Sequence, residues 1–196
     1  MRIIAGKWGG RRLQAPVGRD TRPTGDRVRE SLFSSLHSRL GTFEGLHVLD
    51  AFAGSGALGF EALSRGAAEL TAVEYERKSA QIITDNYTRL IGDNSRQQGK
   101  DSNFRLMRGD IFRLTSRLQN LQVDIAFFDP PYDMSDEKIR DLLIQLNDVH
   151  VFAQEALIVV ERAKGARSEQ LWSDSFRELA RKCVGDTCLY FVSVTQ

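Results

Sequence analysis

The stretch "LHVLDAFAGSGALGFEALSR", residues 46–65, decides the fold of this chain. Its apolar first part is typical of a buried strand, and its last part is typical of a helix that ends before Gly66. Between them, Gly54, Gly56 and Gly59 have the spacing G-x-G-x-x-G, which permits a tight turn and close approach of the backbone to a ligand. The stretch therefore predicts a strand, a ligand-binding turn and a helix, the first unit of an α/β fold.

The same alternation of strand and helix continues along the chain. Apolar runs predict further strands at 69–74, 104–108, 123–129 and 155–161, with helices at 76–91, 111–118 and 136–147. Strands that are apolar on both faces predict a parallel sheet covered by helices on both sides. Gly185 and Asp186 then join two strands, 176–184 and 187–195, with no helix between them. One strand of this hairpin must run antiparallel to the rest of the sheet.

The N-terminal part of the chain is the basic part. Residues 1–40 contain nine Lys or Arg and three Asp or Glu, a net charge of +6, whereas the remainder carries −5. We predict a hairpin-like arm at 2–15 and a helix with Thr24 as N-cap, and we divide the chain into a basic arm, 1–23, and one domain, 24–196. A basic segment of this kind is either a solvated face or a surface that binds a polyanion.

Composition excludes several classes of protein. No segment approaches the roughly 18 apolar residues that a membrane helix needs, and the N-terminus lacks the apolar centre of a signal peptide. We therefore expect a cytoplasmic monomer without a membrane partner. Cys183 and Cys188 form no zinc-binding pattern with the three histidines, which predicts no metal. The hairpin can bring the two cysteines together, but a reducing cytosol favours free thiols.

Glu74 extends the glycine motif. It ends the next predicted strand, 20 residues after Gly54, where a carboxylate can bind ribose hydroxyls. Strand, glycines, helix and acid together predict a nucleoside ligand. An NAD-type pyrophosphate and the amino-acid tail of S-adenosylmethionine both fit this geometry, so the motif alone leaves the two open.

The stretch "FFDPPYD", residues 127–133, favours the second ligand. Asp129 ends a buried strand and therefore lies at the ligand-binding edge of the sheet. Pro130 and Pro131 have no N–H groups and restrict the residue before them, so the segment presents carboxylate and carbonyl acceptors in a fixed arrangement. The exocyclic amine of a purine complements these acceptors, and Tyr132 offers a ring for base stacking. Acceptors that orient this weakly nucleophilic amine favour transfer of a methyl group to it.

Several motifs together resemble one known family. The segments "RPTGDRVRESLF" (22–33), "LDAFAGSGALGFEALSRGA" (49–67), "VE" (73–74), "GD" (109–110) and "FFDPPY" (127–132) are similar to those of the bacterial 16S rRNA guanine-N2 methyltransferases. The resemblance covers nearly the whole chain, and the segment at 22–33 is its most specific part. It implies an α/β, Rossmann-like class I methyltransferase sandwich. The sheet would have seven mostly parallel strands with a C-terminal antiparallel hairpin, and a short basic β-arm would precede it.

The resemblance also implies the ligands and the residues that hold them. The donor would be S-adenosylmethionine, with S-adenosylhomocysteine as product, and the target would be the N2 amine of one guanine in 16S rRNA, in the small ribosomal subunit or its assembly intermediates. The cofactor-binding residues would be Thr24, Asp50, Phe52, Gly54, Gly56, Glu74, Asp110, Ile111 and Asp129. The catalytic base pocket would be formed by Asp129, Pro130, Pro131 and Tyr132.

The basic arm supplies the candidate RNA-binding residues. Arginine and lysine side chains bind phosphates, and the candidates are Arg2, Lys7, Arg11, Arg12 and Arg22. Trp8 can either stack on a base or cover the apolar side of the arm. Three other functions remain open: a nicotinamide oxidoreductase, a DNA adenine-N6 methyltransferase, and a non-catalytic RNA-binding protein on a methylase fold.

Overall fold

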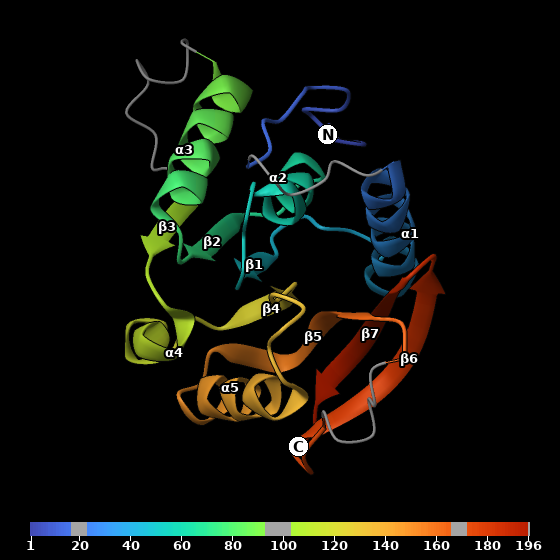
Figure 1. The fold of residues 1–196 in the computed structure, drawn as a ribbon, viewed down its shortest axis with the longest axis vertical. Coiled ribbons are helices and arrows are strands. Elements are labelled where there is room, and N and C mark those ends of the chain that lie inside the picture. The colour runs from blue at the N-terminus through green and yellow to red at the C-terminus, as the bar shows by residue number, and fades with distance from the viewer. Residues whose placement is uncertain (17–22, 93–102, 166–171, 196) are drawn as a thin grey trace.

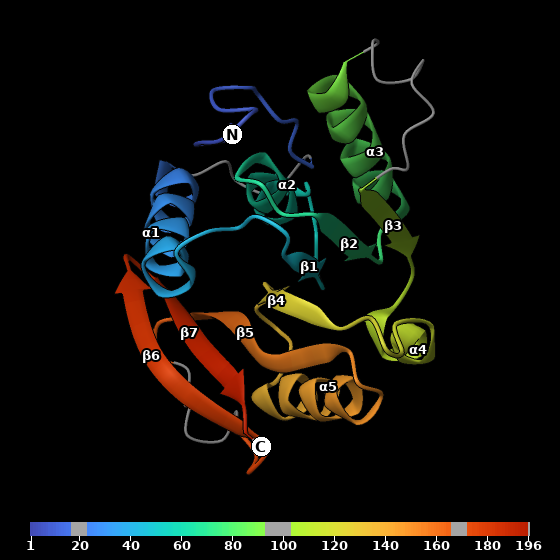
Figure 2. The same cartoon turned by 180° about the vertical axis from the view of Figure 1, so that it is seen from behind.

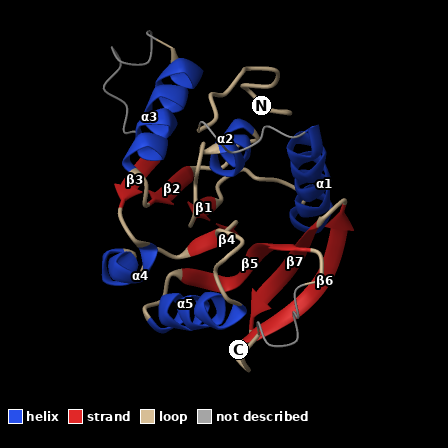
Figure 3. Ribbon diagram, viewed as in Figure 1, coloured by secondary structure: helices blue, strands red, loops and turns tan. Residues whose placement is uncertain are grey.

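A computed structural model describes residues 1–16, 23–92, 103–165 and 172–195. Its elements alternate between helix and strand up to β5 and end in a hairpin (Figure 3). The helices are α1 (Pro23–Leu40), α2 (Ala57–Ser64), α3 (Arg77–Ile91), α4 (Ile111–Leu114), the 3₁₀ turn η2 (Thr115–Arg117) and α5 (Asp136–Asp148). The strands are β1 (His47–Asp50), β2 (Glu69–Glu74), β3 (Phe104–Arg108), β4 (Val123–Phe128), β5 (Phe152–Ala163), β6 (Phe176–Val184) and β7 (Thr187–Val194).

The strands form one seven-stranded sheet within the described residues, in the order β3-β2-β1-β4-β5-β7-β6. Strands β1 to β5 pair in parallel, whereas β7 runs antiparallel to both β5 and β6. The predicted fold class is therefore confirmed, including the single reversed strand that the Gly185–Asp186 connection requires. One local prediction is wrong: α1 begins at Pro23, so Thr24 lies inside the helix and not at its N-cap.

Helices cover both faces of the sheet. Figures 1 and 2 show α1, α2 and α3 on one side and α4 and α5 on the other. Successive strand residues point to opposite faces, so Phe127 joins the core beneath α1 to α3 while Phe128 joins the core beneath α4 and α5. This two-sided burial explains why the central strands are apolar throughout.

None of the described helices combines the length and the apolar character that crossing a membrane requires.

The N-terminal arm is docked on the helical layer beside α2 (Figures 1 and 2). A single antiparallel bridge, Arg2 to Arg12, gives the arm its hairpin form. The backbone N–H groups of Ile4 and Ala5 donate to the buried Glu61 carboxylate at 2.6 and 3.0 Å. Because hydrogen bonds to a buried charge are stronger than neutral ones, Glu61 fixes the arm to α2.

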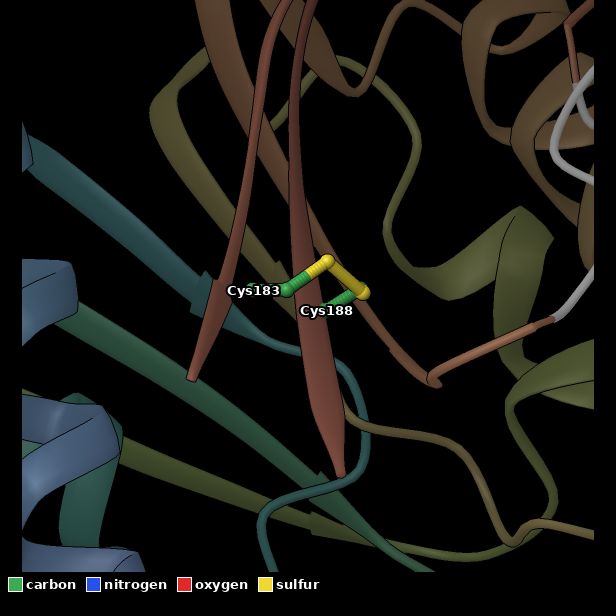
Figure 4. The surroundings of a disulfide bond; sticks show 2 residues. All are labelled: Cys183 and Cys188. Atoms are coloured by element: carbon green, nitrogen blue, oxygen red, sulfur yellow. A yellow bond between two sulfur atoms is a disulfide. The ribbon is translucent and has the colours of Figure 1, made fainter. Parts of the chain in front are cut away.

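The two cysteines are bonded to each other. Cys183 of β6 and Cys188 of β7 lie opposite one another and form a disulfide (Figure 4), so the expectation of free thiols is wrong for this structure. The two-residue turn brings them into register with their Cα atoms 4.0 Å apart. The expectation gave the reducing cytosol more weight than the proximity that the hairpin allows, and the structure shows that proximity.

The disulfide can be tested by labelling. We expect the unreduced protein to take up no iodoacetamide and the reduced, unfolded protein to take up two equivalents, as measured by intact mass. Because the bond closes a short loop, reduction should lower the free energy of unfolding by about 2 kcal/mol. The Cys183→Ser, Cys188→Ser double variant should show no effect of reductant. Two adducts on the unreduced chain would show that the thiols are free.

Candidate active site

An acid lies within two residues of the carboxyl end of each of the five parallel strands. These acids gather at one edge of the sheet because parallel strands all end there. In chain order they are Asp50, Glu74, Asp110, Asp129 and Glu161. Helix α2 begins at the same edge, immediately after the glycine turn. The edge therefore combines acidic acceptors with the N–H groups of a helix N-terminus.

Two cavities open at this edge. The first, of about 270 Å³, is lined by Asp50, Phe52, Gly54, Asp129 and Tyr132 among the predicted site residues. The second, of about 1030 Å³, is lined by Phe52, Glu74, Asp110, Ile111 and Pro131. Phe52 and Pro16 line both, so the two cavities adjoin. The structure thus gathers most of the predicted cofactor and base residues around one continuous depression.

The glycine turn is fixed by hydrogen bonds to strand-end acids. Gly54 donates its N–H to the Glu74 carboxylate at 2.7 Å, and Gly59 donates its N–H to Asp50 Oδ2 at 3.1 Å. Gly56 lines neither cavity. Its φ of +80° is left-handed, and a Cβ there would lie 2.4 Å from the Phe60 ring. Its role in this structure is therefore to form the turn, because only glycine fits that conformation and that space.

Asp50 is the most deeply buried acid of the edge, with 1% of its surface exposed. Burial raises the pKa of its carboxyl group from the ordinary 3.8 to about 7, and the charges of Asp129 and Glu74 act in the same direction. The N–H groups of Gly59 and Phe52 oppose this shift. Asp50 Oδ1 is buried and has no partner in hydrogen-bond geometry. The site therefore holds an acceptor that a cationic ligand would satisfy.

The remaining acids of the cofactor prediction keep capacity for a ligand. Glu74 accepts from Gly54 with one oxygen and from the Glu76 N–H with the other, at 2.7 Å each. Asp110 is the N-cap of α4 and accepts from the Phe112 N–H at 3.1 Å. A carboxylate has about four acceptor positions, so both groups can accept further hydrogen bonds from the second cavity. The side chain of Thr24 lies outside the described residues.

The segment after β4 presents an exposed ring beside a fixed turn. Tyr132 is 68% exposed, so it is not a core aromatic residue. Pro130 is buried, and the Pro131 carbonyl accepts from the Met134 N–H at 3.0 Å. Buried Arg162 donates to the Met134 carbonyl at 2.8 Å and pairs with Asp136 at 2.9 Å. The far end of the segment is thus anchored to β5 by a buried guanidinium.

All four basic residues that the structure describes in the arm, Arg2, Lys7, Arg11 and Arg12, are exposed, as an RNA-binding role requires. Two of them also make contacts within the protein. Arg11 donates to the Leu90 carbonyl at 2.6 Å, where it caps the end of α3. Lys7 lies 4.5 Å from the centre of the Trp8 ring, and burial lowers its pKa. Arg22 lies outside the described residues.

Trp8 is part of the core. Only 8% of its surface is exposed, and it belongs to the apolar cluster beneath α1 to α3. The sequence left two roles open for Trp8, stacking on a base and covering the apolar side of the arm. In the structure Trp8 covers the apolar side of the arm. A base cannot stack on this ring in the arrangement seen, because the arm folds the ring inward.

The family model described as conserved hypothetical protein 95 matches residues 1–193 of this chain. The chain belongs to this family. A relative named "Ribosomal RNA small subunit methyltransferase D" from Escherichia coli is 38% identical over 82% of this chain and 74% of its own length. A relative of the same name from Haemophilus influenzae is 37% identical over 84% of this chain and 79% of its own length. The predicted resemblance to rRNA methyltransferases is therefore confirmed.

Solved structures agree with the family assignment. The structure of yhhF from Escherichia coli has a TM-score of 0.76 and 30% identity, and the match covers 99% of this chain and 97% of that one. The match therefore includes the arm and the terminal hairpin of this chain as well as the sheet.

Two residues of this family member that sequence reasoning passed over line the first cavity. Glu161 lies near the end of β5, and burial together with the Asp129 charge raises its pKa to about 8. The signal that could have found it is the one that identified Glu74, an acid at the end of a predicted strand. Arg29 lies on α1 and is buried, with 6% of its surface exposed. No local signal distinguishes it from the other arginines nearby.

No group of three or more metal-binding side chains gathers anywhere in the part of the chain that the structure describes.

Replacing Asp50 tests the electrostatics of the edge. A raised pKa in the folded state means that the folded protein binds more protons, so Asp50 costs stability as the pH rises from about 4 to about 7. Asp50→Asn removes this cost but keeps an acceptor for Gly59. We compare the free energy of unfolding of the variant with that of the unchanged protein. We expect the difference, in favour of the variant, to grow between pH 4 and pH 8 by as much as about 4 kcal/mol.

Urea unfolding at several pH values measures this difference. The exposed Asp148, replaced by Asn, is the matched control and should follow the unchanged protein at every pH. An Asp50→Asn curve parallel to that of the unchanged protein would contradict the assignment of a raised pKa.

Proposed function

We propose that this protein transfers a methyl group from S-adenosylmethionine to the N2 amine of one guanine in 16S rRNA. The observation that carries the proposal is the shared first cavity, which Gly54 and Asp50 of the glycine turn and Asp129 and Tyr132 of the later segment line together. A donor and a target base held by these two groups of residues would meet in one place. The rRNA methyltransferase relatives support the choice of RNA.

The residues present fit the donor. The unpartnered Asp50 Oδ1 is a buried acceptor for the ammonium group of its methionine part. Glu74 and Asp110 line the second cavity, where they suit ribose hydroxyls and the adenine amine, with Ile111 as an apolar wall. When bound, S-adenosylmethionine supplies an electrophilic methyl group on a positively charged sulfur. Phe52 lines both cavities, and Gly54 lines the first.

The segment after β4 would position the target amine. The Asp129 carboxylate and the Pro130 carbonyl accept one hydrogen each from the exocyclic amine, which directs the nitrogen lone pair toward the methyl group. Tyr132 is exposed at the mouth of the cavity and can stack on a base that has left its helix or loop. As the N–C bond forms and the S–C bond breaks, the nitrogen must lose one proton. The acids nearest to it in the cavity are Asp129 and Glu161.

Glu161 favours guanine over other amine-bearing purines. Guanine presents two neighbouring donors, the N1–H and the N2 amine, whereas adenine has an acceptor at N1. Two carboxylates beside each other, Asp129 for the amine and Glu161 for the N1–H, match the guanine pattern. Glu161 has a pKa of about 8, and the guanine N1–H stabilises its ionised form, whereas the N1 lone pair of an adenine opposes that form. This argument favours guanine-N2 over adenine-N6 methylation.

The basic arm completes the proposal. The exposed Arg2 and Arg12 are phosphate-binding candidates, with Lys7 and Arg22 in the same segment. The proposed partner is 16S rRNA in the small subunit or its assembly intermediates, and the proposed setting is the cytoplasm, with the protein acting as a monomer. The proposed reaction uses no metal, because the acids of the cavity accept the hydrogen bonds and the proton of the amine directly.

Replacing Asp129 tests the reaction. We expect Asp129→Ala to lower methyl transfer to small-subunit particles by at least about 100-fold, because the amine loses its charged acceptor. The exposed Asp148→Ala is the control and should keep full activity. Mass mapping of 16S rRNA from cells with and without the protein should show one methyl group missing from a guanine amine. Full activity of Asp129→Ala would refute the base pocket, and identical maps would refute the proposed substrate.

Base analogues test Glu161. In rRNA whose mapped target guanine is replaced by 2-aminopurine, the N2 amine remains but N1 becomes an acceptor. At pH 9, above the pKa of about 8 of Glu161, we expect the unchanged protein to methylate guanine roughly 10- to 100-fold faster than 2-aminopurine. Glu161→Gln should narrow this ratio to within about threefold, because the Gln amide can donate to N1. A Glu161→Gln variant that slows both substrates equally would show that Glu161 does not read the base.

A further inference from the structure

Two buried polar atoms of opposite character lack partners at the first cavity. Asp50 Oδ1 is a carboxylate oxygen, and Arg29 Nε is a guanidinium donor. Both residues line the cavity, and both are more than nine-tenths buried. Buried polar atoms are nearly always hydrogen-bonded in folded proteins, so each of the two is available to a ligand group that enters the cavity.

Arg29 is held in place by contacts that leave its charge available. One Nη donates to the Arg2 carbonyl at 2.7 Å and to Asp26 Oδ1 at 2.8 Å. The other lies 3.6 Å from the sulfur of Met1, which is a weak acceptor. Asp26 is 44% exposed, so water screens its charge. Burial lowers the pKa of Arg29, whereas the nearby Asp26 and Glu61 raise it.

A single ligand that satisfies both atoms must carry a donor for Asp50, such as an ammonium group, and an acceptor for Arg29, such as a carboxylate. An α-amino acid zwitterion has this composition. A simple carboxylic acid would leave Asp50 without a partner, and a simple amine would leave Arg29 without one. The donors left for that carboxylate are Nε and the Nη that contacts only the Met1 sulfur, because the other Nη has both its hydrogens engaged.

We propose that Arg29 binds the carboxylate of the donor's amino-acid end while Asp50 accepts its ammonium group. This inference rests on the proposed function, and it assigns to α1 a residue that selects donors by their carboxylate. Arg29 lies on the same helix as Thr24, the residue that the family resemblance implies for this end of the cofactor. The arm takes part indirectly, because the Arg2 carbonyl orients the guanidinium.

Titration calorimetry with two ligands tests the inference without any RNA. The ligands are S-adenosylmethionine and its decarboxylated form, which lacks only the carboxylate. We expect the unchanged protein to prefer the former by roughly 10- to 100-fold. Arg29→Met, which keeps the side-chain volume, should bind the two within about threefold of each other, and its affinity for the decarboxylated form should stay near that of the unchanged protein.

Two further variants make the test specific. Arg27→Met removes an exposed arginine from the same helix and should keep the original preference. Arg29→Lys keeps the charge but loses the planar fork, so it should retain part of the preference, and it carries the test if Arg29→Met does not fold. An unchanged preference in the Arg29 variants, or equal weakening of both ligands, overturns the inference. If the unchanged protein binds neither ligand, the proposed function itself fails.

Discussion

The site depends on one electrostatic constraint: the parallel strands deliver their terminal acids to the same edge. Burial raises the pKa of Asp50 and Glu161, and the charges of neighbouring acids act in the same direction. An edge built from acceptors alone is unfavourable unless donors lie opposite it. The fold supplies some of these donors, and a ligand rich in N–H and ammonium groups would supply the rest.

The donors that the fold supplies explain how the turn and the loop are held. Gly54 and Gly59 give their N–H groups to the acids of β2 and β1, so the glycine turn is tied to the strands on both sides. Arg162 anchors the segment after β4 from β5. These contacts fix backbone near the acids but leave Asp50 Oδ1 unsatisfied. The unsatisfied oxygen lowers the stability of the folded protein until a cationic group binds there. Such a trade-off between stability and function is common at active sites.

The sequence predicted what depends on local pattern. Strand ends, glycine spacing and the proline pair are local, so the fold and the edge acids Glu74 and Asp129 followed from them, whereas Asp50 and Asp110 were implied by the family resemblance. The role of Trp8 and the buried position of Arg29 depend on how the arm docks, through contacts more than 50 residues apart in the chain, such as those of Glu61. Pattern carries no information on such contacts. The disulfide was missed because cellular redox chemistry outweighed hairpin geometry in the argument.

The docking of the arm changes how its charge should be understood. A flexible basic tether would contribute phosphate contacts and nothing else. Here Ile3, Trp8 and Leu13 belong to the same core as the sheet, and the Arg2 backbone orients Arg29 at the first cavity. The exposed side chains of Arg2 and Arg12 are therefore presented from a rigid base adjacent to the cavity. Phosphate contacts made there would set the position of a bound strand relative to Asp129, because arm and cavity share the same packed framework.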